Sequence, residues 1–246
     1  MRRLESAPMR RALHIQNEAT DQAELFVDAL RMAGVEVDVV HPYAGEDLPA
    51  GLTGYAALIS GGGTVDTHQT AEHPWLVLEI ELIREALRTA KPFMGLCLGA
   101  QLLTAAAHGE VYACEPNEVG WAPVELTEAA AHDPLFAGLP ERFMAMQWHA
   151  YACRPPEGAV ELVRNHVCTQ ALRVGHNAWG TQFHIEVTRG ILMDWLEMGG
   201  AELERHGINR DRFLYDLDVH LNNHIEIGRI LAGRFAELAV RRARAA

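Results

Sequence analysis

The chain has 246 residues and a formal net charge of −12, and 49% of its residues are hydrophobic. This length and composition predict one large domain, or one domain with a small extension, that buries a substantial core. The acidic charge argues against a nucleic-acid-binding protein, which normally presents a basic face.

The cysteines and the apolar segments point to a reducing compartment. The cysteines at 97, 114, 153 and 168 form no C-x-x-C pair, which argues against a zinc ribbon or a disulfide framework. No signal-peptide-like apolar stretch opens the sequence, and no segment reaches the ~20 apolar residues that a membrane helix needs. We therefore expect a cytoplasmic protein that binds neither membranes nor nucleic acids.

The first half of the chain alternates between short apolar runs and longer amphipathic runs. Its pattern predicts strands at 12–16, 35–43, 55–60 and 91–96 and helices at 20–34, 73–90 and 99–109. Thr20 or Asp21 is expected to cap the first helix. Strands and helices joined by short links are typical of an α/β fold with a mostly parallel central sheet flanked by helices, as in flavodoxin-like proteins.

The second half has a different pattern. Short alternating runs between 110 and 183 predict strands of a mixed sheet, interrupted by one helix near 129–138. The pattern is helical again from 189, with a long helix from about 211 to 239. We expect a flexible arm at 1–9, a catalytic domain at 10–190, and a helical extension at 191–246 packed on the same domain.

A cysteine between two glycines ends the strand expected at 91–96. Cys97 is the centre of G-L-C-L-G, directly before a helix-forming run. This is the form of a nucleophile elbow, whose glycines avoid Cβ clashes in a sharp strand-to-helix turn. The start of the following helix favours a thiolate, and the amide of Leu98 points to where an oxyanion would form. We therefore expect Cys97 to react rather than merely pack.

Two further segments have the residues that a reactive thiol needs. Gly61, Gly62 and Gly63 follow the strand at 55–60 and let backbone amides turn toward an oxyanion, although a glycine triplet alone also fits a flexible loop. His184 closes an apolar strand, and Glu186 follows two residues later, so both should lie on one side of that strand. A carboxylate there can orient the imidazole that accepts the thiol proton.

These segments, in this order, resemble the class I (triad-type) glutamine amidotransferases. The resemblance rests on A-L-I-S-G-G-G, K-P-F-M-G-L-C-L-G-A-Q-L-L and A-W-G-T-Q-F-H-I-E-V-T, and it covers about residues 10–190. The chain is similar to stand-alone GMP synthase-like members, which include γ-glutamyl hydrolases and peptidases as well as amidotransferase subunits. Gly63 and Ile185 stand where many relatives carry proline, and neither touches a reacting atom.

The resemblance implies a role for each matching residue. The catalytic triad would consist of Cys97, His184 and Glu186. An oxyanion would be stabilised by Leu98 and by the loop at 61–63 through Gly62. The amino-acid end of the substrate would be held by Gln101. Segments resembling E-x-G-W and W-H motifs would line the substrate pocket or a partner-facing surface; they contribute Glu118, Gly120, Trp121, Trp148 and His149. For His149, an ordinary strand histidine remains an equal alternative. No metal or cofactor is implied.

The function expected is cysteine-dependent hydrolysis of the γ-amide of glutamine or of a γ-glutamyl amide through a γ-glutamyl thioester. A subunit that supplies ammonia to a synthase or ligase partner is the alternative, because the segment 191–246 is too short for an acceptor domain. A non-catalytic relative is a weaker alternative. His220 and His224 have the spacing of zinc ligands, but Leu221 replaces the glutamate of H-E-x-x-H, which favours helix surface. A homo-oligomer remains open.

Overall fold

The computed structural model describes residues 10–245, so the arm expected at 1–9 lies outside the described residues. The strands are β1 (Arg11–Ile15), β2 (Glu36–Val40), β3 (Tyr55–Ser60), β4 (Phe93–Leu96), β5 (Glu110–Leu126), β6 (Arg142–Arg154), β7 (Val160–Arg164), β8 (Thr169–Val174) and β9 (Ala178–Thr181). The helices are α1 (Glu24–Met32), α2 (Trp75–Arg88), α3 (Leu98–Ala106), α4 (Arg189–Arg205) and α5 (Arg210–Ala245), with 3-10 turns at Pro42–Ala44 and Glu128–His132.

The strands of residues 10–245 form one nine-stranded sheet with the order β2-β1-β3-β4-β9-β8-β6-β5-β7. The pairings β2–β1, β1–β3, β3–β4 and β4–β9 are parallel. From β9 onward the pairings are antiparallel. The chain is therefore α/β as expected, but the expectation of a mostly parallel sheet is correct only for the half that runs from β2 to β9. Links without crossover helices connect the strands of the other half, short ones between β7, β8 and β9 and a longer one over 127–141 between β5 and β6, and such links allow antiparallel pairs.

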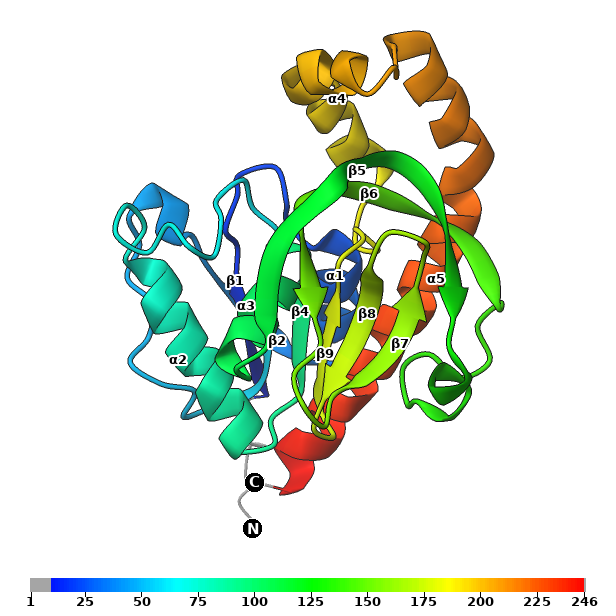
Figure 1. Ribbon diagram of the computed structural model, residues 1–246. Coiled ribbons are helices and arrows are strands. Elements are labelled where there is room, and N and C mark those ends of the chain that lie inside the picture. Colours follow the sequence, from blue (N-terminus) through cyan, green and yellow to red (C-terminus); the bar gives the residue numbers. More distant parts are fainter. Residues whose placement is uncertain (1–9, 246) are drawn as a thin grey trace, which may run out of the picture.

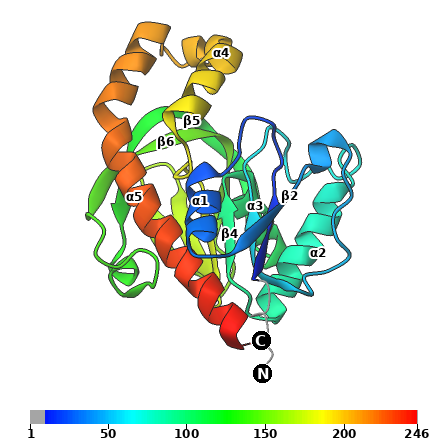
Figure 2. The same ribbon diagram turned by 180° about the vertical axis from the view of Figure 1, so that it is seen from behind.

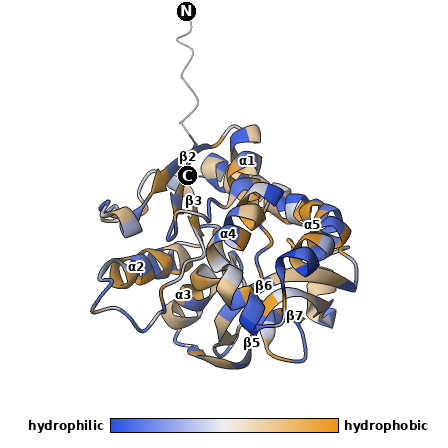
Figure 3. Cartoon of the chain, turned by 90° about the horizontal axis from the view of Figure 1, so that it is seen from above, coloured by the Kyte–Doolittle hydropathy of each residue, from blue (hydrophilic) through white to orange (hydrophobic). Residues whose placement is uncertain are grey.

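Helices cover both faces of the parallel half (Figures 1 and 2). Along β3, Ala57 and Ile59 face the cluster that contains α1 and α5, while Leu58 faces the cluster that contains α2 and α3. Alternate residues of a strand point to opposite faces, so a strand that is apolar throughout requires helices on both sides. Figure 3 shows the same layers from above, with α2 and α3 on one flank and α1 and α5 on the other.

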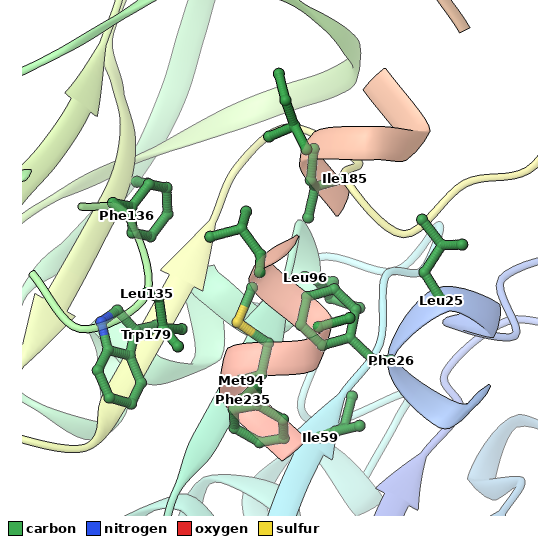
Figure 4. Packing of buried hydrophobic residues seen from close by; sticks show 14 of the residues in the cluster. Leu25, Phe26, Ile59, Met94, Leu96, Leu135, Phe136, Trp179, Ile185 and Phe235 are labelled. Atoms are coloured by element: carbon green, nitrogen blue, oxygen red, sulfur yellow. The ribbon is translucent and has the colours of Figure 1, made fainter. Parts of the chain in front are cut away.

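The core between the sheet, α1 and α5 is built from large side chains. Met94 and Leu96 of β4 lie against Phe26 of α1 and Phe235 of α5 (Figure 4). The two phenylalanine rings meet edge to face, with 6.0 Å between their centroids. This core anchors β4, the strand that leads directly into Cys97.

A helical layer lies above the ends of β5 and β6. The two strands arch over the top of the sheet, and α4 and the first turns of α5 sit above them (Figure 1). Met146 of β6 packs there with Leu196 of α4 and Leu217 of α5. Within residues 10–245, no helix has the length and apolar character that crossing a membrane requires.

Several expected elements differ from the observed ones. The helix expected near 129–138 is a 3-10 turn over Glu128–His132 followed by a turn-rich loop. The first helix begins at Glu24 without a side-chain cap, so neither Thr20 nor Asp21 caps it. The strand expected to reach His184 ends at Thr181, and residues 182–187 form bends and a turn.

Candidate active site

Four loops meet at the carboxyl ends of β1, β3, β4 and β9. Residues from each of them line one cavity of about 390 Å³: Asp21 after β1, Gly63 after β3, Cys97 after β4 and His184 after β9. Open α/β sheets bind ligands at this edge because the loops that follow parallel strands all lie there. The topology therefore brings together four segments that are far apart in the sequence.

Cys97 lies on a strained turn between β4 and α3. Its φ of 49° is in the left-handed region, which non-glycine residues rarely adopt. A Cβ at Gly95 would overlap the backbone of Gly99, and one at Gly99 would overlap the backbone of Ser60. The glycines on either side of Cys97 are thus required by close backbone contact, as the elbow pattern predicts.

The elbow and the glycine loop lie against each other. A Cβ at Gly63 would come within 3.0 Å of Cδ2 of Leu98, and a Cβ at Gly62 would come within 3.1 Å of Cε1 of His184. Leu98 is the first residue of α3, where the backbone amides have no intrahelical acceptor. Of this loop, Gly63 lines the cavity beside Leu98 and Cys97, whereas Gly61 and Gly62 are not among the lining residues.

His184 and Glu186 form a buried pair. The ring Nδ1 of His184 lies 2.6 Å from Oε1 of Glu186, and both residues are almost fully buried. Burial alone would lower the pKa of His184, but the charges of Cys97 and Glu186 raise it well above its ordinary value. The pairing that the H-x-E spacing predicts is present, although a turn rather than a strand creates it.

Asp21 is a member of the site that no sequence motif predicts. Its Oδ2 lies 3.9 Å from Nδ1 of His184, and the residue is 2% exposed. Burial and the nearby charge of Glu186 raise the pKa of Asp21 to about 7, against the opposing effect of His184. The sequence predicts Asp21 only as a candidate helix cap, because no local motif distinguishes the two roles.

The cavity has an aromatic wall that comes partly from α4. The indole Nε1 of Trp148 donates to Oε2 of Glu202 at 2.9 Å, and its ring meets Trp195 edge to face at 5.6 Å. Gly199 of α4 leaves space for this indole, because a Cβ there would overlap the ring. Trp195 also packs against the ring of His184, with 4.6 Å between centroids. Trp195 and Glu202 were not anticipated from the sequence.

Gln101 and His149 lie on another side of the cavity. Nε2 of Gln101 is 3.4 Å from the carbonyl oxygen of Tyr151, and Nδ1 of His149 is 2.9 Å from the same oxygen. Glu118 lies behind His149, with 3.3 Å between Oε2 and Nε2, and accepts a hydrogen bond from Gln170 at 2.7 Å. Hydrogen bonds to this carboxylate and the neighbouring His149 lower the pKa of Glu118 despite its burial.

Three candidates from the E-x-G-W segment lie outside the cavity. Among residues 10–245, the cavity lining includes Trp148 and His149 but leaves out Glu118, Gly120 and Trp121. Trp121 packs under the helical layer against His224, with 5.1 Å between ring centroids. His224 is fully buried, and its Nε2 is 2.7 Å from the carbonyl oxygen of His184. The interpretation of His224 as helix surface is therefore wrong, because α5 turns this face toward the site.

The other thiols are buried and hard to ionise. Burial raises the pKa of Cys153 to about 12, and it also raises the pKa values of Cys114 and Cys168. Two buried groups have donor atoms close enough together to hold a metal ion: Glu118 with His149 and Cys168, and Asp21 with His184 and Glu186. In both groups the histidine is already hydrogen-bonded to protein acceptors.

A thiol on a nucleophile elbow, beside a histidine–glutamate pair at the carboxyl edge of an open sheet, defines a triad-type cysteine enzyme. The family model described as "Glutamine amidotransferase class-I" matches residues 19–197, which include Cys97, His184 and Glu186. The chain belongs to this family of enzymes.

Comparison with known proteins supports this assignment. The glutamine amidotransferase-like protein YfeJ of Salmonella typhimurium is 28% identical over 178 residues, which cover 71% of this chain and 74% of YfeJ. The gamma-glutamyl-L-1-hydroxyisopropylamide hydrolase of a Pseudomonas species is 32% identical over 143 residues, which cover 53% of this chain and 46% of the hydrolase. The crystal structure of a glutamine amidotransferase from Methylobacillus flagellatus is similar with a TM-score of 0.84 and 25% identity, covering 95% of this chain and 96% of that one.

Proposed function

We propose that the chain hydrolyses the γ-amide of glutamine, or of a glutamine-like γ-glutamyl amide, through a γ-glutamyl thioester on Cys97. The observation that carries this proposal is the Nδ1–Oε1 distance of 2.6 Å between His184 and Glu186, in a cavity that Cys97 also lines. Glu186 fixes the ring through Nδ1 and leaves Nε2 to serve the thiol. The name of the Pseudomonas relative supports a γ-glutamyl amide as the substrate.

The first half of the reaction forms the thioester. His184 takes the proton of the Cys97 thiol, and the sulfur attacks the γ-carbonyl carbon. The amides of Gly62 and Leu98 donate to the oxygen that becomes negative in the tetrahedral intermediate. The carbon–nitrogen bond then breaks, and His184 gives its proton to the departing ammonia or amine.

The second half releases glutamate. Water attacks the thioester carbon and gives a proton to His184, and the carbon–sulfur bond breaks. The proton returns to the sulfur, which regenerates the thiol. Thiolate and imidazolium charges form together in this cycle, and the raised pKa of His184 is consistent with such a pair because Cys97 and Glu186 both favour the protonated ring.

The amino-acid end of the substrate has candidate partners in Gln101 and His149, which line the same cavity as His184. Gln101 is 5% exposed, and its amide nitrogen is held only by long contacts of 3.4 Å to Tyr151 and Gln182. Contacts of this length leave the amide free to bind a substrate carboxylate more tightly. His149 adds a ring at the same wall.

The test is steady-state glutamate release by the purified chain from glutamine and from several γ-glutamyl amides, without ATP, metal or a second protein. We expect release from at least one of them, and we expect an electrophilic glutamine analogue to add its mass to Cys97 and not to Cys114. Inactivity on every amide, followed by activation when a synthase-type partner is added, would favour the ammonia-supplying subunit instead. Labelling of Cys97 without any turnover in either assay would favour a non-catalytic relative.

A further inference from the structure

The cavity has an excess of negative charge. Its lining includes the carboxyl groups of Glu18, Asp21, Asp66 and Glu202 against the rings of His149 and His184, and among residues 10–245 it includes no lysine or arginine. The γ-glutamyl head of any substrate is a zwitterion with one ammonium and one carboxylate, so it leaves this excess uncompensated. The volume of about 390 Å³ is within the range of pockets that hold drug-sized ligands, which gives room beyond glutamine itself.

Asp21 and Glu202 come from segments that contact the ring of His184. In the proposed reaction His184 protonates the leaving nitrogen, so the leaving group lies next to His184. Asp21 is 3.9 Å from Nδ1 of His184, and Trp195 packs against its ring. Glu202 comes from the same helix as Trp195. Gln101 and His149, the candidate partners of the amino-acid end, belong to α3 and β6.

The buried carboxyl group of Asp21 is a second, independent sign that the cavity binds a cationic group. The residue is 2% exposed and lines the cavity, and no side chain within the described part of the chain donates a hydrogen bond to its carboxylate, which only the backbone amides of Ala23 and Gly62 approach. A buried polar group without a partner costs free energy that a ligand can recover by supplying the missing donor. A carboxyl group accepts hydrogen bonds most strongly from a cationic donor, such as an ammonium group.

The rest of this side suits an apolar chain that ends in a cation. Trp148, Trp195 and Tyr151 offer aromatic surface to methylene groups and to a nearby positive charge. Met198, which is 69% exposed, extends the apolar surface at the cavity. Oε2 of Glu202 accepts from Trp148, which leaves its other oxygen for a ligand.

From these contacts we propose that the preferred substrate is a γ-glutamyl amide whose leaving amine carries a second, cationic nitrogen, as in a singly γ-glutamylated diamine. This inference rests on the proposed hydrolysis and specifies its leaving group. Hydrolysis breaks the bond between the γ-carbonyl carbon and the amide nitrogen, water supplies the hydroxyl group of glutamate, and the diamine leaves with the proton from His184. Asp21 and the other carboxylates hold the distal ammonium.

The experiment compares three γ-glutamyl amides of equal chain length: those of 1,4-diaminobutane, of pentylamine and of 4-aminobutanoate. They differ in the charge at the distal end, which is positive, neutral or negative. We expect kcat/KM for the cationic amide to exceed that of the neutral one by about tenfold or more at low salt, with the anionic amide slowest. The cationic preference should shrink as salt is added, because charge attraction at an open cavity is screened.

Variants locate the preference. Asp21→Asn should reduce the ratio of cationic to neutral kcat/KM by at least about fivefold, and the double variant Glu18→Gln, Asp66→Asn should reduce it further. The ratio is read within each variant, so a general loss of activity caused by the contact of Asp21 with His184 cancels. Glu128→Gln makes the same charge change in an exposed 3-10 turn outside the cavity and should keep the wild-type ratio.

The outcomes separate this inference from the proposed function. Release of glutamate from the neutral or anionic amide at a rate equal to or above that of the cationic amide would overturn the inference alone. An unchanged ratio in Asp21→Asn and in the double variant would also overturn it. Failure of all three amides and of glutamine to release glutamate would overturn the proposed function, and the inference with it.

Discussion

Two buried histidine–glutamate pairs lie within the described chain, and they differ in what the second ring nitrogen contacts. In the first pair, Nδ1 of His184 is 2.6 Å from Glu186 and the ring faces Cys97. In the second, Nε2 of His149 lies 3.3 Å from Glu118, while its Nδ1 lies 2.9 Å from the carbonyl oxygen of Tyr151. Both pairs are adjacent to the same cavity, but only one leaves a nitrogen available for proton transfer.

The hydrogen bonds around Glu118 orient the amide groups that face the ring of His149. Glu118 accepts from the amide nitrogen of Gln170, whose oxygen accepts from the nitrogen of Gln147. The oxygen of Gln147 therefore faces Nε2 of His149, at 3.2 Å. Both ring nitrogens of His149 therefore face protein oxygen atoms. A histidine–glutamate pair can act as a base only when its second nitrogen is free, so His149 is not positioned to move protons.

The largest effect is expected from removing the groups that exchange the proton. Cys97→Ala and His184→Ala should each reduce kcat for glutamate release by at least about 10⁴-fold, because nucleophile and base act as a unit. Cys114→Ala, which removes a buried thiol elsewhere, should keep most of the rate. Similar melting temperatures for all three variants would show that the fold is intact. A His184→Ala variant with nearly full activity would contradict the comparison directly.

The two glutamates provide a sharper test. Glu186→Gln retains an acceptor for Nδ1 of His184 but removes the charge that stabilises the imidazolium, so we expect a loss of about 10²–10⁴-fold in kcat. Glu118→Gln should act mainly on stability, lowering the free energy of unfolding by about 1–3 kcal/mol, because its amide group cannot accept all the hydrogen bonds that Asn165 and Gln170 donate to the buried carboxylate.

Kinetics and urea unfolding of both glutamate variants distinguish the two pairs. The loss of kcat in Glu118→Gln should be at least about tenfold smaller than in Glu186→Gln. Equal kinetic losses would mean that both pairs serve the reaction. A silent Glu186→Gln would leave Cys97 and His184 as a dyad.

Much of this site could be predicted because its signals are local. The strand expected at 55–60 is β3. The glycines that the turn at Cys97 requires lie within two residues of Cys97, so a short stretch of sequence is enough to identify the turn. The H-x-E spacing placed His184 beside Glu186 although the backbone there is a turn, since a turn can also bring the first and third residues to one side.

The parts that could not be predicted depend on long-range packing. Asp21 and Glu202 reach the cavity from a loop after β1 and from α4, and single carboxylates carry no local signature. His224 of α5 contacts the carbonyl oxygen of His184 across 40 positions of sequence. The antiparallel half of the sheet has the same limitation, because short alternating runs specify strands but not the order in which they pair.

A third buried glutamate, Glu79, has no histidine as a hydrogen-bond partner among the described residues. It therefore tests what burial does to a carboxyl group without a neighbouring imidazole. Oε1 of Glu79 accepts from Ser60 at 2.6 Å and from Asn17 at 3.2 Å, and burial raises the pKa of Glu79 to about 7. Below pH 4.5 the carboxyl group is protonated in both states; between pH 4.5 and 7 only the folded state keeps the proton. The stability contributed by Glu79 is therefore present below pH 4.5 and lost as pH rises to 7.

Glu79→Gln cannot ionise and should remove this dependence. The unfolding free energy of the variant, minus that of the wild type, should grow by about 1.4 kcal/mol per pH unit between these limits and level off above pH 7. Urea unfolding of both proteins at pH 5, 6, 7 and 8 measures it. A difference that stays constant over this range would show that Glu79 is ionised in the folded protein throughout.

The smallest effect concerns the helix that supports the His184–Glu186 turn. A Cβ at Gly228 of α5 would lie 2.5 Å from the carbonyl oxygen of Ile185 and 2.7 Å from Cδ1 of Leu25, whereas no described atom lies within 4 Å of a Cβ at Gly233. Gly228→Ala should lower the unfolding free energy by about 1–3 kcal/mol and reduce kcat several-fold, because the helix must move away from the turn.

Gly233→Ala is the matched control on the same helix. It should raise stability by about 0.5–1 kcal/mol without changing kcat, since alanine favours a helix interior and meets open space. Urea unfolding and glutamate release measured on both variants test whether α5 positions the catalytic pair. If Gly228→Ala lost stability but kept the wild-type kcat, α5 would support the fold without setting the geometry of His184 and Glu186. The difference between the His184–Glu186 and His149–Glu118 pairs would then be a property of the turn at residues 182–187 alone.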